Sequence, residues 1–398
     1  MKDVTKLVSG RHGHKMERLD VRTVNPSINR GSTYLYDNMN HMSQVRAKAR
    51  ELGTQSYGIN GGDITVDWQE AFCELENGFR GVAVSSGLLA CTAPLLALLG
   101  EGDHLLMIDS VYGPVRTFCD NYLPRIGVSV TYYDPVCTLD ELDRLRTPAT
   151  RVLYLETPGS VTFEMQDIPA LAAWAKDRGL RTIIDNTWGT GLYFKPLDHG
   201  VDISTHAATK YMCGHSDVVS GAIVCNEETV REVEAIRDLF GLSVAPDEIY
   251  MGLRGLRTMA IRLPVHWHNG LAMANHLKGL PEVANVLHPA LEQDPGHALW
   301  QRDFTGASGL FSVVLSRDVS WEQVDAFLRA LKLYGLGYSW GGFESLCVPH
   351  RPQAERTGST WPRPGIGEGF VLRFHAGLED PDDLIADIDQ AIHAMKKV

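Results

Sequence analysis

No apolar run in this 398-residue sequence is long enough to cross a membrane, since none reaches the roughly 18 residues that a spanning helix needs. The first 11 residues carry charges but no apolar segment, so no secretory signal is expected. Basic residues are few: 37 Lys and Arg stand against 49 Asp and Glu, a formal net charge of −12. This shortage argues against general nucleic-acid binding and against an anionic membrane surface. We therefore expect a soluble, cytoplasmic protein.

Cysteine is also scarce, and the seven cysteines are scattered, odd in number and never arranged as C-x-x-C. A disulfide framework and a structural zinc site are not expected, and the thiols should be reduced and mostly buried. The 15 histidines never show H-E-x-x-H spacing, so no metal site is predicted. What is present is ordinary globular composition, 44% hydrophobic, over a length typical of two or three domains of roughly 150 residues.

The first 60 residues are polar with little periodicity, and we expect them to form an extended arm. A helix should begin near Thr65, because Trp68, Phe72 and Leu75 fall on one face and Gly78 can end it. The arm should therefore give way to a folded domain at about residue 61.

Short apolar runs then alternate with helical patterns. Strands are predicted at 82–86, 104–109, 128–133, 151–156, 180–185 and 220–225. Helices are predicted between them at 88–100, 115–123, 138–145 and 168–179. The strands are apolar almost throughout, as in a parallel sheet covered on both faces. The alternation predicts an α/β domain over residues 61–257 with right-handed crossovers and a mostly parallel sheet.

The C-terminal part has a different pattern. Helices are predicted at 229–239, 246–258, 261–277, 321–331 and 381–395, with strands at 310–315 and 370–374. This order indicates a smaller α+β domain over residues 258–398. Residues 349–369 are rich in Pro, Gly and Arg and should form a loop.

Three chemical groups follow strands of the predicted sheet, at the edge where open α/β sheets bind ligands. After residues 85–86, the N–H groups of Gly87 and Leu88 begin a helix and point at anything in front of it, as in phosphate sites. Asp185 closes an apolar strand, where a carboxylate is costly without a cation or donors. Lys210 lies between hydrophobic segments, a setting that lowers a lysine pKa, as imine formation requires. Singly, each group also fits a commoner role: an empty turn, a capping aspartate or a surface lysine.

Together the three groups match what pyridoxal 5′-phosphate (PLP) needs. A lysine forms the imine, a carboxylate keeps the pyridine nitrogen protonated, and a helix N-terminus takes the phosphate. Tyr112, just after the strand at 104–109, would lay a ring over the pyridine face unless it is a core tyrosine. The combination therefore predicts a PLP site.

At this point the motifs become recognisable. AATKY (207–211) with GHSD (214–217) is similar to the cofactor-lysine signature of the Cys/Met-metabolism family of fold-type I PLP-dependent enzymes. The chain resembles that family over essentially its whole length. DNTWGTG (185–191), ETPGS (156–160) and YSWGGFESL (338–346) look like the versions of its cystathionine β-lyase branch. The γ-lyases and γ-synthases tend to have ESPSN-like and SLGG-like segments instead.

The resemblance implies a role for each matching cofactor residue. Lys210 would be the Schiff-base lysine and the acid/base at Cα, Asp185 would pair with the pyridine nitrogen, and Tyr112 would stack on the ring. The phosphate would be held by a further group of residues: Gly87, Leu88 and Thr209, with Tyr57 from a neighbouring subunit.

The resemblance also implies substrate contacts and an assembly. Arg373 would clamp the substrate α-carboxylate with a two-pronged hydrogen bond, unless it is a surface strand arginine. Ser339 and Trp340 would line the same pocket. The polar arm would contribute to the neighbouring subunit of a dimer, paired into a homotetramer.

One segment departs from the family pattern. Where the family usually has arginine after the tyrosine of SYGINGGD (56–63), this chain has Ile59 and Asn60, and Asp63 adds negative charge nearby. This segment therefore offers no basic residue to neutralise the phosphate or to recognise a second substrate carboxylate. Arg116, on the same helix face as Tyr112, is one possible replacement. The arm residues Arg46 and Lys48 are others.

The reaction we expect is PLP-dependent β-elimination across a C–S bond of a β-substituted L-amino acid, giving thiol, pyruvate and ammonia. A racemase or epimerase shares every step through Cα deprotonation, so it stays open. A γ-elimination or replacement enzyme fits the ETPGS and YSWGG segments less well. A non-catalytic, PLP-binding regulatory protein is the alternative of another class.

Overall fold

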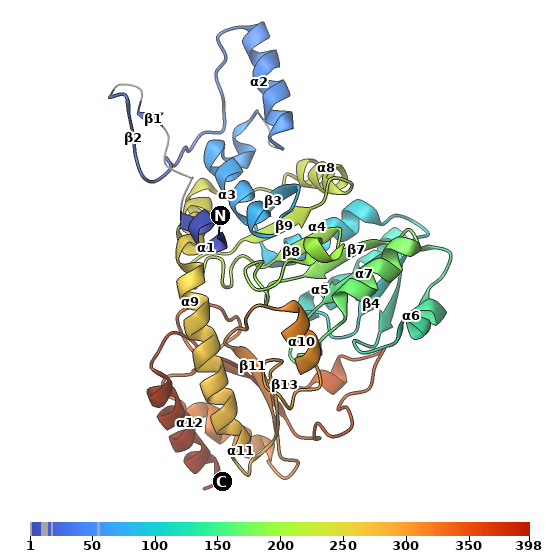
Figure 1. Cartoon of the computed structure of the whole chain (residues 1–398), viewed down its shortest axis with the longest axis vertical. Helices are drawn as coiled ribbons and strands as arrows, with labels where there is room; N and C mark the ends of the chain where they lie inside the picture. Colours follow the sequence, from blue (N-terminus) through green and yellow to red (C-terminus); the bar gives the residue numbers. More distant parts are fainter. Residues whose placement is uncertain (1, 9–14, 17–18, 54–55) are drawn as a thin grey trace.

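The larger domain is built on a seven-stranded sheet with the order β3-β9-β8-β7-β6-β4-β5 (Figure 1). Its strands are β3 (Arg80–Val84), β4 (His104–Ile108), β5 (Ser129–Tyr133), β6 (Thr150–Glu156), β7 (Arg181–Asp185), β8 (Ile203–His206) and β9 (Gly221–Cys225). Neighbours are parallel except that β9 runs antiparallel to β3 and β8. The computed structural model describes residues 2–8, 15–16, 19–53 and 56–398. The predicted α/β fold with a mostly parallel sheet is confirmed.

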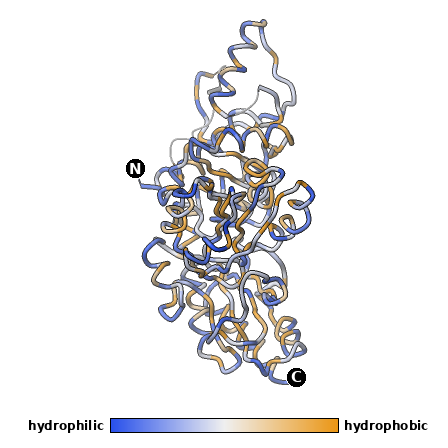
Figure 2. The backbone as a smooth tube through the Cα atoms, turned by 90° about the vertical axis from the view of Figure 1, so that its right-hand side faces the viewer, coloured by the Kyte–Doolittle hydropathy of each residue, from blue (hydrophilic) through white to orange (hydrophobic). Residues whose placement is uncertain are grey.

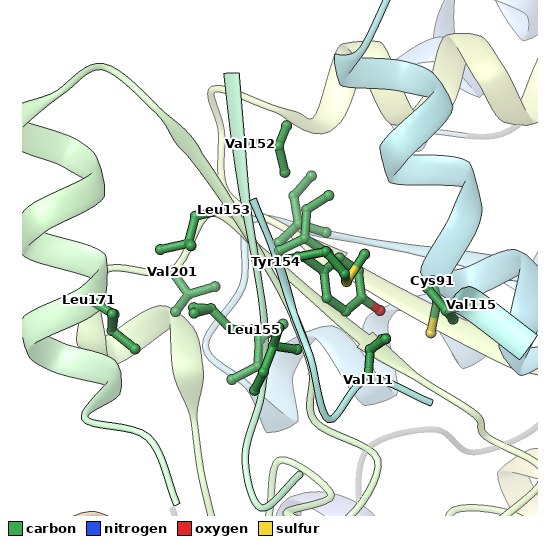
Figure 3. Packing of buried hydrophobic residues seen from close by; sticks show 14 of the residues in the cluster. Cys91, Val111, Val115, Val152, Leu153, Tyr154, Leu155, Leu171 and Val201 are labelled. Carbon is green, nitrogen blue, oxygen red and sulfur yellow. The ribbon is translucent and has the colours of Figure 1, made fainter. Parts of the chain in front are cut away.

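Helices connect these strands and cover both faces of the sheet. They are α3 (Asp63–Leu75), α4 (Gly87–Leu98), α5 (Gly113–Asn121), α6 (Leu139–Leu145), α7 (Ile168–Asp177) and α8 (Val230–Phe240). On β6, Leu153 and Leu155 point toward Leu171 of α7, whereas Tyr154 points toward Cys91 of α4 (Figure 3). All five side chains are buried. Both faces are therefore apolar, as the continuous hydrophobic strands predicted.

A second sheet, ordered β10-β11-β14-β13-β12, forms the smaller C-terminal domain. Its elements are β10 (Val283–Leu287), α10 (His297–Asp303), β11 (Leu310–Leu315), α11 (Trp321–Ala330), β12 (Gly335–Leu336), β13 (Leu346–His350), β14 (Val371–His375) and α12 (Pro381–Met395). Buried Phe311, Phe327 and Phe374 join β11, α11 and β14 in one apolar cluster. The predicted α+β architecture is confirmed, and its exact boundary stays a prediction.

The structure corrects the prediction for several elements. Residues 246–258 and 261–277 belong to a single helix, α9 (Pro246–Lys278), which runs along both domains (Figure 1). Buried Leu256, Met259 and Leu263 keep its apolar face continuous across the expected break. Strand β8 was not predicted, because its sequence ISTH mixes polar and apolar residues, yet all four are buried. The loop at 349–369 is confirmed beyond the end of β13, apart from a short 3-10 turn, η4 (Pro352–Ala354).

The first 60 residues are only partly extended. Helix α1 (Asp3–Val8) packs against α3 and α9, and β1 (Lys15–Met16) pairs with β2 (Val21–Arg22). Helix α2 (Met39–Glu51) projects from the body of the molecule, and Ala49 is its one buried residue (Figure 1). The hydrophobic segments gather instead in the centre of the molecule (Figure 2). The predicted polar character holds, but a helix replaces extended chain because the Asn38 side chain caps it, accepting the His41 N–H.

The thiols lie as predicted. All seven cysteines are free, six are buried, and Cys137 is half-buried. Burial raises the pKa of Cys137 to about 12, so this thiol stays protonated at neutral pH. Within the described ranges, no helix has the length and apolar character needed to span a membrane.

Candidate active site

The carboxyl ends of β4, β6, β7 and β8 meet the smaller domain around a cavity of about 250 Å³, here called the inner cavity. Eight predicted residues line it: Gly87, Leu88, Tyr112, Asp185, Thr209, Lys210, Trp340 and Arg373. A second cavity of about 350 Å³, the outer cavity, shares Tyr112, Lys210, Trp340 and Arg373 with it and adds Ser339. Tyr57 lines neither. The fold therefore brings together all predicted site residues except Tyr57.

Lys210 lies in the loop after β8, at the junction of the two cavities. Its Nζ donates to Ser339 Oγ at 2.7 Å and lies 5.5 Å from the centre of the Trp340 ring. Burial, assisted by the charge of Arg373, lowers the pKa of Lys210 to about 8, while the charge of Asp185 acts in the opposite direction. A lysine with this pKa is partly neutral at physiological pH. It can therefore attack an aldehyde or accept a proton.

Asp185 stands at the end of β7 with its carboxylate held in place. The backbone N–H and the hydroxyl of Thr187 donate to its Oδ1 at 2.9 and 2.5 Å. The thiol of Cys91 lies 3.4 Å from Oδ2. Since thiols are weak donors, Oδ2 retains most of its capacity to accept a hydrogen bond. An oxygen of this kind, facing the inner cavity, suits a protonated ring nitrogen.

Sequence reasoning missed Glu156 as a site residue. It pairs in register with Asp185 on the neighbouring strand, and it accepts the Tyr112 N–H at 2.8 Å and the Ser160 hydroxyl at 2.5 Å. Burial and the adjacent Asp185 charge raise the pKa of Glu156 well above its ordinary value. Glu156 is therefore more readily protonated than an ordinary glutamate. The signal was visible, since Glu156 and Asp185 both end adjacent predicted strands.

The start of α4, where the sequence predicts that a phosphate binds, forms one end of the inner cavity. An added Cβ on Gly87 would lie only 2.4 Å from Cβ of Ala207, so glycine alone fits here. The Thr209 hydroxyl lines the cavity but donates to the Ser220 carbonyl at 3.1 Å. The only basic residues in the lining are Lys210 and Arg373. Among the described residues, backbone N–H groups would therefore be the main donors for a phosphate at this place.

Arg373 projects from the middle of β14 into both cavities. Its guanidinium donates to the Ser339 carbonyl at a long 3.4 Å. Burial lowers the pKa of Arg373 to about 10, which still leaves it a cation at neutral pH. In the part of the chain that the structure describes, no carboxylate forms a salt bridge with it. A half-buried guanidinium without a carboxylate partner suits a carboxylate ligand.

Arg116 does not replace the missing phosphate arginine. It lines the outer cavity rather than the inner one, and it forms a buried ion pair with Asp109. Its guanidinium also lies 3.7 Å from the centre of the Tyr132 ring. The suggestion from helix spacing is therefore wrong, because Asp109 already neutralises this charge.

The SYGINGGD segment lies away from its own chain's cavities. Tyr57 is 55% exposed at the start of the short turn η1 (Gly58–Asn60). Ile59 lies near Gly241, at the end of α8, rather than near Lys210. A contribution of Tyr57 to a site requires a second copy of the chain, and it stays a prediction.

The whole arrangement matches a known family. A sequence profile of the Cys/Met metabolism PLP-dependent enzymes matches residues 5–393. The chain belongs to this family. Cystathionine beta-lyase of Escherichia coli is 39% identical over 378 residues, which cover 94% of this chain and 95% of that protein. The crystal structure of cystathionine gamma synthase from Xanthomonas oryzae, in complex with aminoacrylate and cysteine, has a TM-score of 0.87 at 30% identity and covers 100% of this chain and 99% of its own.

Another relative is named for a different reaction. The L-alanine/L-glutamate racemase of Wolbachia pipientis is 38% identical over 334 residues, covering 84% of this chain and 81% of that protein. The family's cofactor is PLP. The residues present fit it: a cradle at Gly87 that a Cβ would fill, an acceptor at Asp185, and a lysine with a pKa of about 8.

Proposed function

We propose that this protein is a PLP-dependent carbon–sulfur lyase that eliminates the β-substituent of an L-amino acid, giving a thiol, pyruvate and ammonia. One observation carries the proposal. Lys210 Nζ lies at the junction of a cofactor-sized cavity and a substrate-sized cavity, 2.7 Å from Ser339 Oγ, with Arg373 lining both. A cation for the α-carboxylate and a base for the α-proton therefore face one substrate position.

Each residue would contribute a separate physical effect. When bound, PLP supplies an electron sink for the charge that develops at Cα. Lys210 would hold the cofactor and move the α-proton, because its pKa of about 8 allows both protonation states near neutral pH. Asp185 would hold the proton on the ring nitrogen. Arg373 would fix the α-carboxylate, which turns the Cα–H bond toward Lys210.

The outer cavity would receive the leaving group. Its charged residues are mostly paired already, since Arg116 binds Asp109 and Arg356 binds Glu164 at 3.1 Å. Besides Lys210 and Arg373, which would serve the α-proton and the α-carboxylate, the remaining charge in this lining is that of Glu355, which is exposed. A neutral or cationic distal group therefore suits the cavity better than an anionic one.

We expect cystathionine, with its distal carboxylate, to be a poor substrate compared with S-alkyl cysteines. The position that usually carries arginine in this family holds Ile59, so a charge-assisted contact of roughly 1.5–3 kcal/mol is absent. The ratio of kcat/KM for S-ethyl-L-cysteine and for L-cystathionine measures this. A clear preference for cystathionine would refute it.

The variant Ile59→Arg tests the same contact from the protein side. It should lower the dissociation constant of PLP and improve kcat/KM for cystathionine, with Ile59→Leu as the matched control. No gain in either quantity would mean that another basic group, such as Arg46 or Lys48 of the arm, already fills this place.

Assembly is the next part of the proposal. Leu35 and Met39, at the start of the projecting α2 segment, are 91% and 72% exposed, and Tyr57 is 55% exposed. Apolar exposure of this kind suits a contact with a second copy. We expect a cytoplasmic homotetramer built from dimers with isologous contacts. Light scattering should give at least a dimer, and a fully active monomer would contradict this.

Racemisation is the second candidate, and the Wolbachia racemase favours it. Products separate the two reactions. Elimination from S-ethyl-L-cysteine releases pyruvate and ethanethiol in equal amounts, whereas racemisation of L-alanine or L-glutamate changes optical rotation without pyruvate. We expect stoichiometric pyruvate and thiol. Racemisation without either product would overturn the proposal, as would products of γ-elimination or catalytic silence of a PLP-loaded protein.

A further inference from the structure

Two buried histidines, His266 and His375, pack beside the catalytic lysine, and the mechanism above uses neither. They are 0% and 1% exposed, and their ring centroids are 5.1 Å apart. The ring of Tyr211, the residue after Lys210, packs against both, at 5.1 and 5.9 Å. His375 follows Arg373 by two residues on β14, so both side chains leave the same face of the strand.

His375 binds the turn that carries Ser339 and Trp340. The N–H of Gly341 donates to its Nε2 at 3.0 Å. A backbone N–H needs an acceptor, so Nε2 carries no proton, and the neutral ring holds its proton on Nδ1. The Gly342 carbonyl lies 3.1 Å from the same Nε2 and would suit only the other tautomer. In that tautomer, or in a protonated ring, the Nε2–H group of His375 would face the Gly341 N–H. The hydrogen bond between His375 and Gly341 would then be lost.

His266 presents the complementary pattern. Its Nδ1 lies 2.9 Å from the Ala376 carbonyl and must donate to it, which leaves a lone pair on Nε2. Among the described residues, Nε2 of His266 and Nδ1 of His375 have no hydrogen-bond partner, and one offers a lone pair while the other offers an N–H. The charged groups that act on the pair are Lys210, Arg262 and Arg373, all cationic. Together with burial, which lowers the pKa of His266 to about 4, they keep both rings neutral.

The turn that His375 holds is strained and lies directly on Lys210. Ser339 has a φ of +87°, which L residues rarely adopt. An added Cβ on Gly341 would lie 3.0 Å from Cα of Lys210, so the turn and the lysine backbone are in close contact. A strained conformation persists only where its surroundings hold it. Among the described residues, His375 and, over a long 3.4 Å, Arg373 make the side-chain hydrogen bonds to the backbone of residues 339–342.

We propose that His375 is a positioning residue that, as a neutral acceptor for the Gly341 N–H, holds Ser339 and Trp340 against Lys210, with His266 favouring the required tautomer. The proposal rests on the proposed function in one respect, since it takes Lys210 as the catalytic base. Its structural part, the anchoring of the turn, is independent of which reaction Lys210 serves.

The variant His375→Leu removes the acceptor, and His375→Gln restores one, because a glutamine oxygen reaches about where Nε2 stands. Hydrogen exchange of the apoprotein is the first readout. In His375→Leu, exchange of the peptide covering residues 338–344 should accelerate at least about tenfold while the strands of the large sheet exchange as before. His375→Gln should exchange like the parent. These results do not depend on activity.

Kinetics of the PLP-loaded protein are the second readout. With Ser339 released, His375→Leu should lower kcat by about 10- to 100-fold with little change in KM, because the α-carboxylate contact of Arg373 remains. His375→Gln should recover most of the loss. In a Ser339→Ala background, His375→Leu should cost less than about threefold, since it acts through that side chain.

His104→Leu is the matched control. His104 is also buried, binds Thr150 and Thr131 at 2.7 and 2.9 Å, and lies at the opposite edge of the large sheet. It should leave local exchange at 338–344 and kcat unchanged. If His375→Leu does not fold, His375→Asn, whose shorter amide falls short of Gly341, should behave as the leucine variant would. Unchanged exchange and kcat in the variants at position 375, or equal effects of His104→Leu, would overturn the proposal. A protein that lacks elimination but shows the exchange result would refute only the proposed function.

Discussion

Replacing Lys210 with alanine is expected to lower kcat/KM at least about 10³-fold, because one side chain would supply both the cofactor attachment and the proton transfer. Its pKa of about 8 and its position between the two cavities suit both tasks. The protein should remain folded, since no other described hydrogen bond of the side chain besides that to Ser339 would be lost. Steady-state kinetics with S-ethyl-L-cysteine measure the effect.

Lys195→Ala is the matched control for this variant. Lys195 is also partly buried, but it binds the Leu75 carbonyl and pairs with Asp3 at 3.1 Å, away from both cavities. Its loss should leave kcat/KM within about threefold of the parent, as expected for a residue remote from the chemistry. A Lys210→Ala protein that kept a tenth of the parent activity would show that another group removes the α-proton.

Arg373→Ala is expected to raise KM strongly, with a loss of about 2–4 kcal/mol in kcat/KM, or roughly 30- to 1,000-fold. The Arg373 side chain is half-buried and lacks a carboxylate partner in the described structure, so a substrate carboxylate would be its first strong ligand. Binding of PLP, followed by absorbance, should persist.

Arg373→Lys separates charge from geometry. It keeps the positive charge but loses the two-pronged hydrogen bond, so it should fall between the parent and Arg373→Ala. Kinetics of Arg373→Ala equal to those of the parent would mean that another residue holds the α-carboxylate.

The site residues near the strand ends were predictable because polar and charged residues stand out where apolar strands end. Asp185 and Lys210 each stand out as polar groups beside hydrophobic runs, and parallel strands bring such ends to one edge. The sheet itself followed from continuous hydrophobic strands such as β6. The motifs then placed Arg373 and Trp340, which come from the other domain and which no local pattern connects to Lys210.

What the sequence could not show depends on contacts between distant segments. The helix face shared by Tyr112 and Arg116 suggested a phosphate contact, but Asp109 captures Arg116, and only the folded chain brings those charges together. The tautomer of His375 likewise depends on Gly341, 34 residues earlier in the chain. Tyr57 could contribute to a site only in a second subunit, and the sequence of one chain does not show how two subunits pack.

The role of Lys210 as the lysine that holds PLP can be tested directly. Reduction of the PLP-loaded protein with borohydride fixes the cofactor on the lysine to which it is joined, and mass spectrometry of the digested protein then locates it. We expect one cofactor per chain, on the peptide that contains Lys210. A label on any other lysine, or a protein that retains no cofactor after incubation with PLP, would contradict it.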